Sequence, residues 1–300
     1  DSLDGNLTSS ITITGTVDVN TTGVYTLTYS VSDGSSNETN ATRTVNVGMA
    51  STHTADLNTT VQLEMLWVEP GTFTMGSPTT EAGRGTNETE HNVTLTQGFY
   101  LGKYEVTQAQ YEAVMTGNSD GLSATPSQWP NNPNRPVEKV SWDDIQIFLS
   151  RLNVQQSPNI PSGWAYVLPT EAQWEYACRA GTTSAYSWGN TLLKSKLNYN
   201  SSGVGKTSNV GNYSPNNWGF HDMHGNVYEW VSDRYGEYPS NNINIDPTGP
   251  VTGDSRVIRS GSWRTVYGSN LRSASRQSHN PSSSHHQYGS LGFRLSLQKS

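Results

Sequence analysis

Hydrophobic and polar residues alternate in short runs through the first 48 residues of the chain. Alternation with a period of two is typical of a β-strand with one buried face. Gly, Asn and Asp residues separate the runs, as they do in tight turns. The runs cover Ser10–Thr14, Val24–Val31 and Thr42–Val47. This pattern predicts a small all-β module with antiparallel strands over residues 1–48, and a small, polar linker over residues 49–60.

The pattern changes from Val61 onward, where strand-like runs alternate with helical periods. Met65–Ser77 predicts a strand pair around a Pro-Gly turn. Three helices are predicted from apolar spacing and from a residue that can cap each helix start. They lie near Thr107–Met115, at Trp142–Asn153 after Ser141, and from Thr170 to Gly181, with Asp144 and Gln173 three residues after the second and third caps. Only short strands, turns and loops are predicted beyond the third helix, so residues 61–300 form a loop-rich α+β domain.

Composition supports a loop-rich fold with aromatic packing. Hydrophobic residues are 32% of the chain and charged residues only 14%, which is too polar for a helical bundle. The 9 Trp and 15 Tyr argue against disorder, because disordered segments are poor in aromatic residues.

Charge and cysteine content exclude several classes of function. The formal net charge is −7 and no basic stripe is visible, which excludes nucleic acid as a partner. No apolar run approaches the roughly 20 residues of a membrane span in this fragment. The chain begins inside the β module, so we expect further residues before it. Cys178 is the only cysteine, which excludes an intrachain disulfide and any site that needs two thiolates.

Seven phrases in the second region resemble the formylglycine-generating enzyme (sulfatase-modifying factor) family. They are Trp67–Ser77, Tyr104–Gln108, Pro136–Asp144, Leu168–Ala177, Trp218–Trp230, Ser260–Trp263 and Leu291–Arg294. They stand in the family's order and cover about residues 61–297. The resemblance implies a large variant of the C-type lectin fold. Because the family hosts several activities, the fold does not decide the function.

The oxidase members of this family bind copper through two cysteines shortly after the Gly-Ser-aromatic phrase. Thr265 and Asn270 hold the matching positions here, and neither supplies a thiolate. Cys178 is expected to be a buried structural thiol. The sequence therefore predicts a protein without copper that is not an enzyme.

The sequence disfavours two other kinds of catalytic site. A second branch of the family contains non-haem iron enzymes with a His-rich site, but this chain has no His pair one helical turn apart, so we expect no iron. A Ser/His/Asp hydrolase is disfavoured because no Gly-x-Ser-x-Gly elbow occurs.

The resemblance also implies calcium sites. Ca²⁺ takes six to eight oxygen ligands from carboxylates, carbonyls and water. At the first implied site Asp222 and Glu229 give carboxylates, and Gly225 and Val227 give backbone oxygens. In the alternative reading, Glu229 only braces the loop through hydrogen bonds. A weaker second site would use Asn198, Tyr199, Ser202 and Val204, where Ser202 replaces the family's acidic ligand. Either ion would be structural.

The run from Arg264 to Ser290 is unusual because family residues persist within a Ser-, His- and Tyr-rich stretch. Ser, His, Tyr, Asn, Gly, Thr and Val, which recur between those family residues, can all be reached from one Asn codon by changing its adenines. The run therefore resembles the variable region of proteins diversified by retroelements, which often have this fold, and the composition of an antibody paratope. An ordinary low-complexity loop is the alternative. The predicted ligand-binding residues are Arg264, Thr265, Val266, Tyr267, Ser269, Asn270, Ser275, Ser278, His279, Asn280, Ser282, Ser283, His285, His286, Tyr288 and Ser290.

The N-terminal phrase Gly23–Asp33 resembles bacterial immunoglobulin-like modules, of which only the later strands are recognisable. Such modules act as spacers on surface proteins. The sequence thus predicts a monomeric, extracellular display protein on a cell or virion surface. Its variable face, within residues 264–290, would bind an external protein or surface ligand. An enzyme of the sulfatase-modifying family is the alternative.

Overall fold

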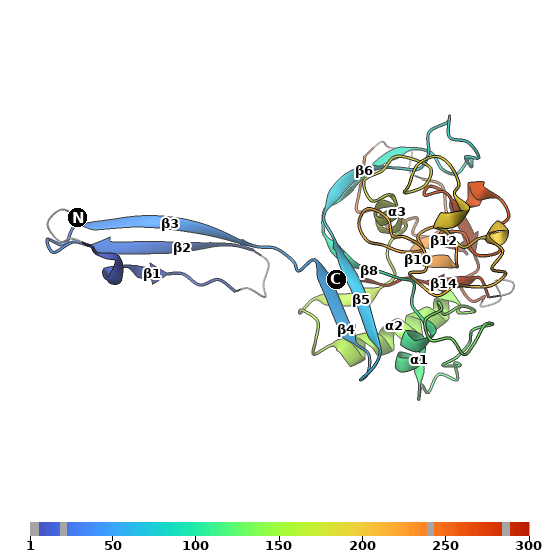
Figure 1. Cartoon of the computed structure of the whole chain (residues 1–300), viewed down its shortest axis with the longest axis horizontal. Helices are drawn as coiled ribbons and strands as arrows, with labels where there is room; N and C mark the ends of the chain where they lie inside the picture. Colours follow the sequence, from blue (N-terminus) through green and yellow to red (C-terminus); the bar gives the residue numbers. More distant parts are fainter. Residues whose placement is uncertain (1–5, 19–22, 239–242, 284–288, 300) are drawn as a thin grey trace. The chain divides into compact units, whose positions relative to one another are not determined.

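The computed structural model describes residues 6–18, 23–238, 243–283 and 289–299. The chain divides into two compact units, residues 1–51 and 52–300. The first unit is a three-stranded antiparallel sheet in the order β1-β2-β3 (Figure 1). Its elements are a short 3-10 helix η1 (Thr8–Ser10), β1 (Thr12–Thr14), β2 (Gly23–Ser32) and β3 (Glu38–Val47). The predicted antiparallel strands are confirmed.

Three short sheets and three helices form the second unit. The sheets have the orders β13-β12-β10-β14, β11-β7-β6 and β4-β5-β8-β15-β9. Only β10 with β14 and β7 with β11 pair in parallel within the described residues. The strands are β4 (Thr52–Asp56), β5 (Gln62–Val68), β6 (Gly71–Met75), β7 (His91–Leu95), β8 (Phe99–Gly102), β9 (Trp164–Val167), β10 (Tyr228–Arg234), β11 (Ile243–Ile245), β12 (Arg256–Arg259), β13 (Gln277–His279), β14 (Leu291–Phe293) and β15 (Ser296–Lys299).

All three predicted helices are confirmed, and each starts at a capping box. They are α1 (Gln108–Met115), α2 (Trp142–Gln156) and α3 (Glu171–Arg179). The caps are Thr107, Ser141 and Thr170, whose hydroxyls accept hydrogen bonds from the N–H groups of Gln110, Asp144 and Gln173. Three short 3-10 helices follow: η2 (Lys194–Lys196), η3 (Asn200–Ser202) and η4 (Gly268–Leu271).

Two expectations about chain organisation need correction. Residues 52–56 form β4, which pairs with β5, so the second domain begins about nine residues before the predicted Val61 and the linker is shorter. The strands around Pro70 exist but do not pair with each other. β5 pairs with β4 and β8, whereas β6 pairs with β7, because the chain passes from one sheet to another at this turn.

The main core lies around α3, which packs against β6 and β10 (Figure 1). Trp174 of α3 is fully buried among apolar side chains from β8 and β10, including Phe99 and Val231. α1 and α2 lie side by side, and α2 also packs against β9. The described part of the chain contains no helix long and apolar enough to cross a membrane.

Candidate ligand-binding face and metal sites

Buried arginines hold the C-terminal run, residues 264–290, against the rest of the second unit. Arg272 makes two hydrogen bonds to Glu88, each of 2.8 Å, and also pairs with Glu81. Arg276 makes a bidentate pair with Glu171 of α3, at 2.8 Å from Nε and 2.6 Å from the terminal nitrogen. Both arginines are buried, and a bidentate guanidinium–carboxylate pair fixes geometry as well as charge.

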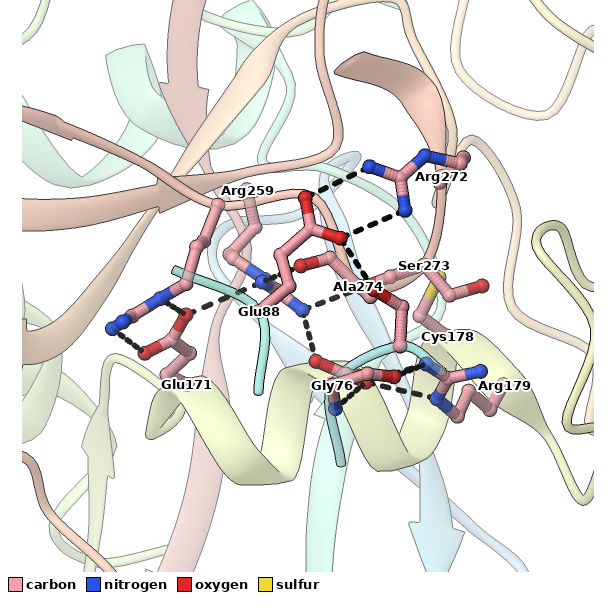
Figure 2. A network of polar contacts seen from close by, with 12 residues as sticks. Gly76, Glu88, Glu171, Cys178, Arg179, Arg259, Arg272, Ser273 and Ala274 are labelled. Atoms are coloured by element: carbon pink, nitrogen blue, oxygen red, sulfur yellow. Dashed lines mark hydrogen bonds and ion pairs between the residues drawn. The ribbon is translucent and has the colours of Figure 1, made fainter. Parts of the chain in front are cut away.

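Arg259 of β12 links this network to the backbone of the run. Its guanidinium pairs with Glu175 at 2.6 Å and donates to the carbonyl oxygens of Ser273 and Ala274 at 2.7 and 3.1 Å (Figure 2). Arg179 pairs with the other oxygen of Glu175 at 2.8 Å. The segment 272–276 is therefore held in place by polar contacts to α3 and to Glu88.

Other family residues in the run and beside it are also buried. Leu271, Ala274, Leu291 and Phe293 are essentially inaccessible. Trp263 is half-buried, and its Nε1 donates to the carbonyl of Gly289 at 2.8 Å.

The predicted ligand-binding residues fall into three groups of exposure. Val266 is 60% exposed and Tyr267 71%, and they lie just before η4. Ser278, Asn280 and Ser282 are also exposed, and the half-buried residues are Arg264, Ser269, Asn270, His279 and Ser283. His285, His286 and Tyr288 lie outside the described residues.

Thr265, Ser275 and Ser290 were predicted to bind the ligand, but their side chains are buried. The Thr265 hydroxyl accepts a hydrogen bond from Ser262 N–H at 2.9 Å, which closes a turn. Ser275 N–H bonds to the carbonyl of Arg272, and the Ser290 carbonyl accepts from Tyr228 N–H at the start of β14. These three residues support the face rather than form it.

A second loop extends the exposed surface beside η4. Asn200 N–H donates to the carbonyl of Thr265 at 3.2 Å, and the Tyr186 hydroxyl donates to the carbonyl of Gly268 at 2.9 Å. This loop carries the exposed residues Leu193, Lys194, Val204 and Lys206. None of them was predicted to belong to the face. The signal in the sequence is that residues 180–221 contain three lysines and no Asp or Glu.

The only cysteine is unsuited to catalysis. Cys178 is fully buried in α3, and burial raises the pKa of its thiol to about 12. Its Sγ lies 3.6 Å from Nε2 of His224, whose pKa burial lowers to about 4. An uncharged thiol beside an uncharged imidazole lacks the thiolate that redox and metal chemistry need.

At the first implied calcium site, the two carboxylates have different surroundings. Asp222 is buried, and its Oδ2 accepts from Gly211 N–H at 2.7 Å. Its Oδ1 is buried and has no partner among the residues the structure describes. Glu229 instead pairs with Arg294 at 2.8 Å and accepts from Trp174 Nε1 at 2.7 Å. A guanidinium already balances Glu229, so only Asp222 retains an oxygen that fits a cation.

At the second implied site, one hydroxyl group lies close to two acceptor oxygens. The Ser202 hydroxyl lies 2.9 Å from Asn198 Oδ1 and 2.6 Å from the carbonyl oxygen of Tyr199. One hydroxyl proton satisfies only one of these two acceptors. These three oxygens would supply at most half of the six to eight ligands that Ca²⁺ takes. Among the described residues, these two sites included, no cluster of three or more His, Cys, Asp or Glu side chains is arranged to hold a metal ion.

Comparison with known proteins identifies relatives of both units. Residues 1–47 match the family described as bacterial surface protein, Ig-like domain. The formylglycine-generating enzyme of Streptomyces coelicolor is 36% identical over 180 residues, which are 54% of this chain and 52% of that enzyme. The mouse formylglycine-generating enzyme is 28% identical over 292 residues, 77% of this chain and 74% of the enzyme. The match thus spans about half the length of the Streptomyces relative.

Two solved structures share the fold. Variable protein 1 of Treponema denticola superposes with a TM-score of 0.70 at 26% identity and covers 83% of this chain and 100% of its own. PvdO from Pseudomonas aeruginosa has a TM-score of 0.68 at 26% identity, with 84% and 100% covered. These likenesses confirm the predicted fold class. Residues 51–299 match the sulfatase-modifying factor enzyme 1-like domain family, and the chain therefore belongs to that family.

Proposed function

We propose that this chain is a non-catalytic ligand-binding protein, the variable protein of a diversity-generating retroelement, with its diversified residues in the C-terminal run. The observation that carries the proposal is the sorting of side chains within the run. Family residues such as Arg272 and Arg276 are buried and bonded, while Val266 and Tyr267 stand in solvent. Exposed positions tolerate rewriting, since surface substitutions generally change stability by no more than about ±0.5 kcal/mol.

The exposed residue types suit recognition. Tyr267 offers a large amphipathic surface at low entropic cost, and Ser278, Asn280 and Ser282 offer adaptable hydrogen bonds. The proposal includes His285, His286 and Tyr288 on their sequence alone.

The second loop beside η4 lies outside the variable run, and its side chains indicate the charge of the partner. Lys194 and Lys206 are exposed there, and neither residues 180–221 nor residues 255–300 contain an Asp or Glu. Exposed Leu193, 41% accessible, adds an apolar contact. Complementary charge steers association and selects partners. The proposed ligand is therefore a protein with an acidic surface, although this chain is itself acidic overall.

The alternative, an oxidase of this family, would need a pair of reactive cysteines. Thr265 and Asn270 stand at the positions of the oxidase cysteines, and the pKa of Cys178 keeps the remaining thiol protonated at neutral pH. A relative's printed name describes that relative's activity, and fold alone does not transfer it.

The first unit supports an extracellular place for the protein. Its family consists of bacterial surface modules, and the proposed role is a spacer that holds the ligand-binding unit on a cell or virion surface. Calcium is proposed as a structural ion, held by Asn198, Tyr199, Ser202 and Val204, with Asp222 and the carbonyls of Gly225 and Val227 at the less suitable first site. When bound, the ion would order these loops.

Two displayed libraries test the proposal. One randomises the exposed positions Val266, Tyr267, Ser278, Asn280 and Ser282, and the matched one randomises the buried positions Thr265, Leu271, Ala274, Ser275 and Ser290. We expect the first library to stay folded and to yield binders against an acidic protein, and the second to lose folded display. Equal loss of folding in both libraries contradicts the proposal. So does oxygen consumption by the copper-treated protein with a cysteine-containing peptide.

A further inference from the structure

A pocket of about 460 Å³ opens near the start of α3, and its volume is in the range of small-molecule sites. Met75, Ala172, Ile245 and Pro250 supply its apolar walls. Val266, Tyr267 and the other exposed positions of the run do not line it, so it differs from the proposed ligand-binding face.

Asp233 is the unusual polar group of this pocket. Its side chain is only 4% exposed. Its Oδ2 accepts hydrogen bonds from Glu171 N–H at 2.8 Å and from the Ser232 hydroxyl at 3.1 Å. Its Oδ1 has no hydrogen-bond partner among the described residues. Because Oδ1 is not one of the fully enclosed polar atoms that lack a partner, it is open to the pocket, and a bound donor can reach it.

The other charged groups of the lining do not supply the missing donor. Arg276 is the only Arg or Lys among the described lining residues, and its nitrogens are already bonded to Glu171 and to the carbonyl of Gly236. Its guanidinium also lies 4.0 Å from the centre of the Tyr238 ring. His91 also lines the pocket, and its Nδ1 lies 2.9 Å from the carbonyl oxygen of Thr89. Glu237 adds a further acceptor.

The pocket therefore combines apolar walls with an acceptor that no described residue bonds, and the one Arg of its described lining is already paired. We propose that it binds a protonated primary amine on an apolar body, with the ammonium group against Asp233 Oδ1. The ammonium group has three donors and a positive charge, so it satisfies Oδ1 and balances the carboxylate. This inference goes beyond the proposed function and does not depend on it.

Calorimetric titration of the whole chain at pH 8, where the Asp233 carboxyl is ionised, with benzylamine and with the neutral benzyl alcohol tests the proposal. We expect benzylamine to bind about ten-fold more tightly, since a hydrogen bond to a charged group contributes at least that factor. Asp233→Asn keeps an acceptor for Glu171 N–H but removes the charge, and should abolish the preference. Asp120→Asn, at an exposed loop position, is the matched control and should retain it.

A second variant separates pocket binding from a folding defect. Thr248 is exposed at the pocket rim, so Thr248→Trp should obstruct the pocket without altering its charge or the core. We expect this variant to melt like the unmodified chain and to lose benzylamine. Equal binding of the amine and the alcohol, or an unchanged preference in Asp233→Asn, overturns the proposal. An Nα-acetyl-lysinamide titration identifies the source of the amine: tighter binding than benzylamine indicates a partner's lysine, and weaker binding indicates a free amine.

Discussion

Within one short stretch of the C-terminal run, Arg272 and Arg276 reach inward to carboxylates, while Val266 and Tyr267 reach into solvent. The inward residues depend on partners far away in the sequence, since Arg272 and Glu88 are 184 residues apart. The outward residues lack such fixed partners. The run is therefore held by a few long-range ion pairs, which leaves its outer surface free to change sequence.

Breaking the inner side should have the largest effect. Arg259→Met removes the guanidinium that pairs with Glu171 and Glu175 and supports the carbonyls of Ser273 and Ala274. Removing one partner of a buried ion pair leaves an uncompensated charge and costs about 3–5 kcal/mol. Urea unfolding should show this loss. Lys194→Met, at an exposed position, is the control and should stay within about 0.5 kcal/mol. Equal effects would remove the distinction between the two sides.

Calcium binding is a second proposed way in which the exposed side of the run is stabilised, and it can be tested by mutation. The loop of Asn198 and Ser202 adjoins the run through Asn200 and Thr265, and Ser202→Asp would supply a carboxylate to the oxygen cluster. An ion at 100 times its Kd stabilises the folded state by about 2.7 kcal/mol. We expect calcium to raise the melting temperature of Ser202→Asp more than that of the unmodified chain, and a chelator to reverse the rise.

Ser201→Asp places the same charge at the neighbouring exposed position and is the control for this experiment. It should show no gain from calcium beyond that of the unmodified chain. Identical melting curves with calcium and with chelator in all three proteins would refute the calcium proposal.

The pH dependence of stability should also come from the inner side. Burial, with the nearby charge of Glu171, raises the pKa of Asp233 to about 7 from its ordinary 3.8. The folded chain therefore holds a proton that the unfolded chain releases between about pH 4 and 7, so stability falls as pH rises through this window. Asp233→Asn should flatten that fall, with a gain on the order of 2 kcal/mol at pH 8. Urea midpoints from pH 4.5 to 8 measure it.

Asp254→Asn, at an exposed position, should leave the pH profile unchanged. An unaltered slope in Asp233→Asn would mean that Asp233 is already ionised in the folded chain across this range. The outer residues Val266 and Ser278 have no ionisable side chain, so they contribute no slope.

Local features were predictable from the sequence, and distant pairings were not. The caps at Ser141 and Thr170 need only a partner three residues away, so the helices could be placed. The strands on either side of Pro70 were predicted at the right positions but with the wrong pairing. β5 pairs with β8 and β6 pairs with β7, and the tertiary fold determines these partners.

In the candidate site, too, local features were predictable and distant contacts were not. Family phrases marked the run and its fixed residues. They did not reveal that Thr265 and Ser290 are buried, because turn closure and strand pairing decide that. The pocket at Asp233 combines residues from β6, β7, α3 and β10 with a later loop, and no local pattern predicts such an assembly.

The smallest effect is expected on the outer surface itself. Replacing Val266, Tyr267, Ser278, Asn280 and Ser282 together by other polar residues should change the free energy of unfolding by about 1 kcal/mol or less, because each exposed change stays within about ±0.5 kcal/mol and the signs vary. The same five changes should abolish binding to any protein selected against the face. Phe293→Ala, at a buried position, is the contrast and should cost about 3–5 kcal/mol. If the fivefold variant instead unfolds, these side chains belong to the structural network, and the run does not display variable residues.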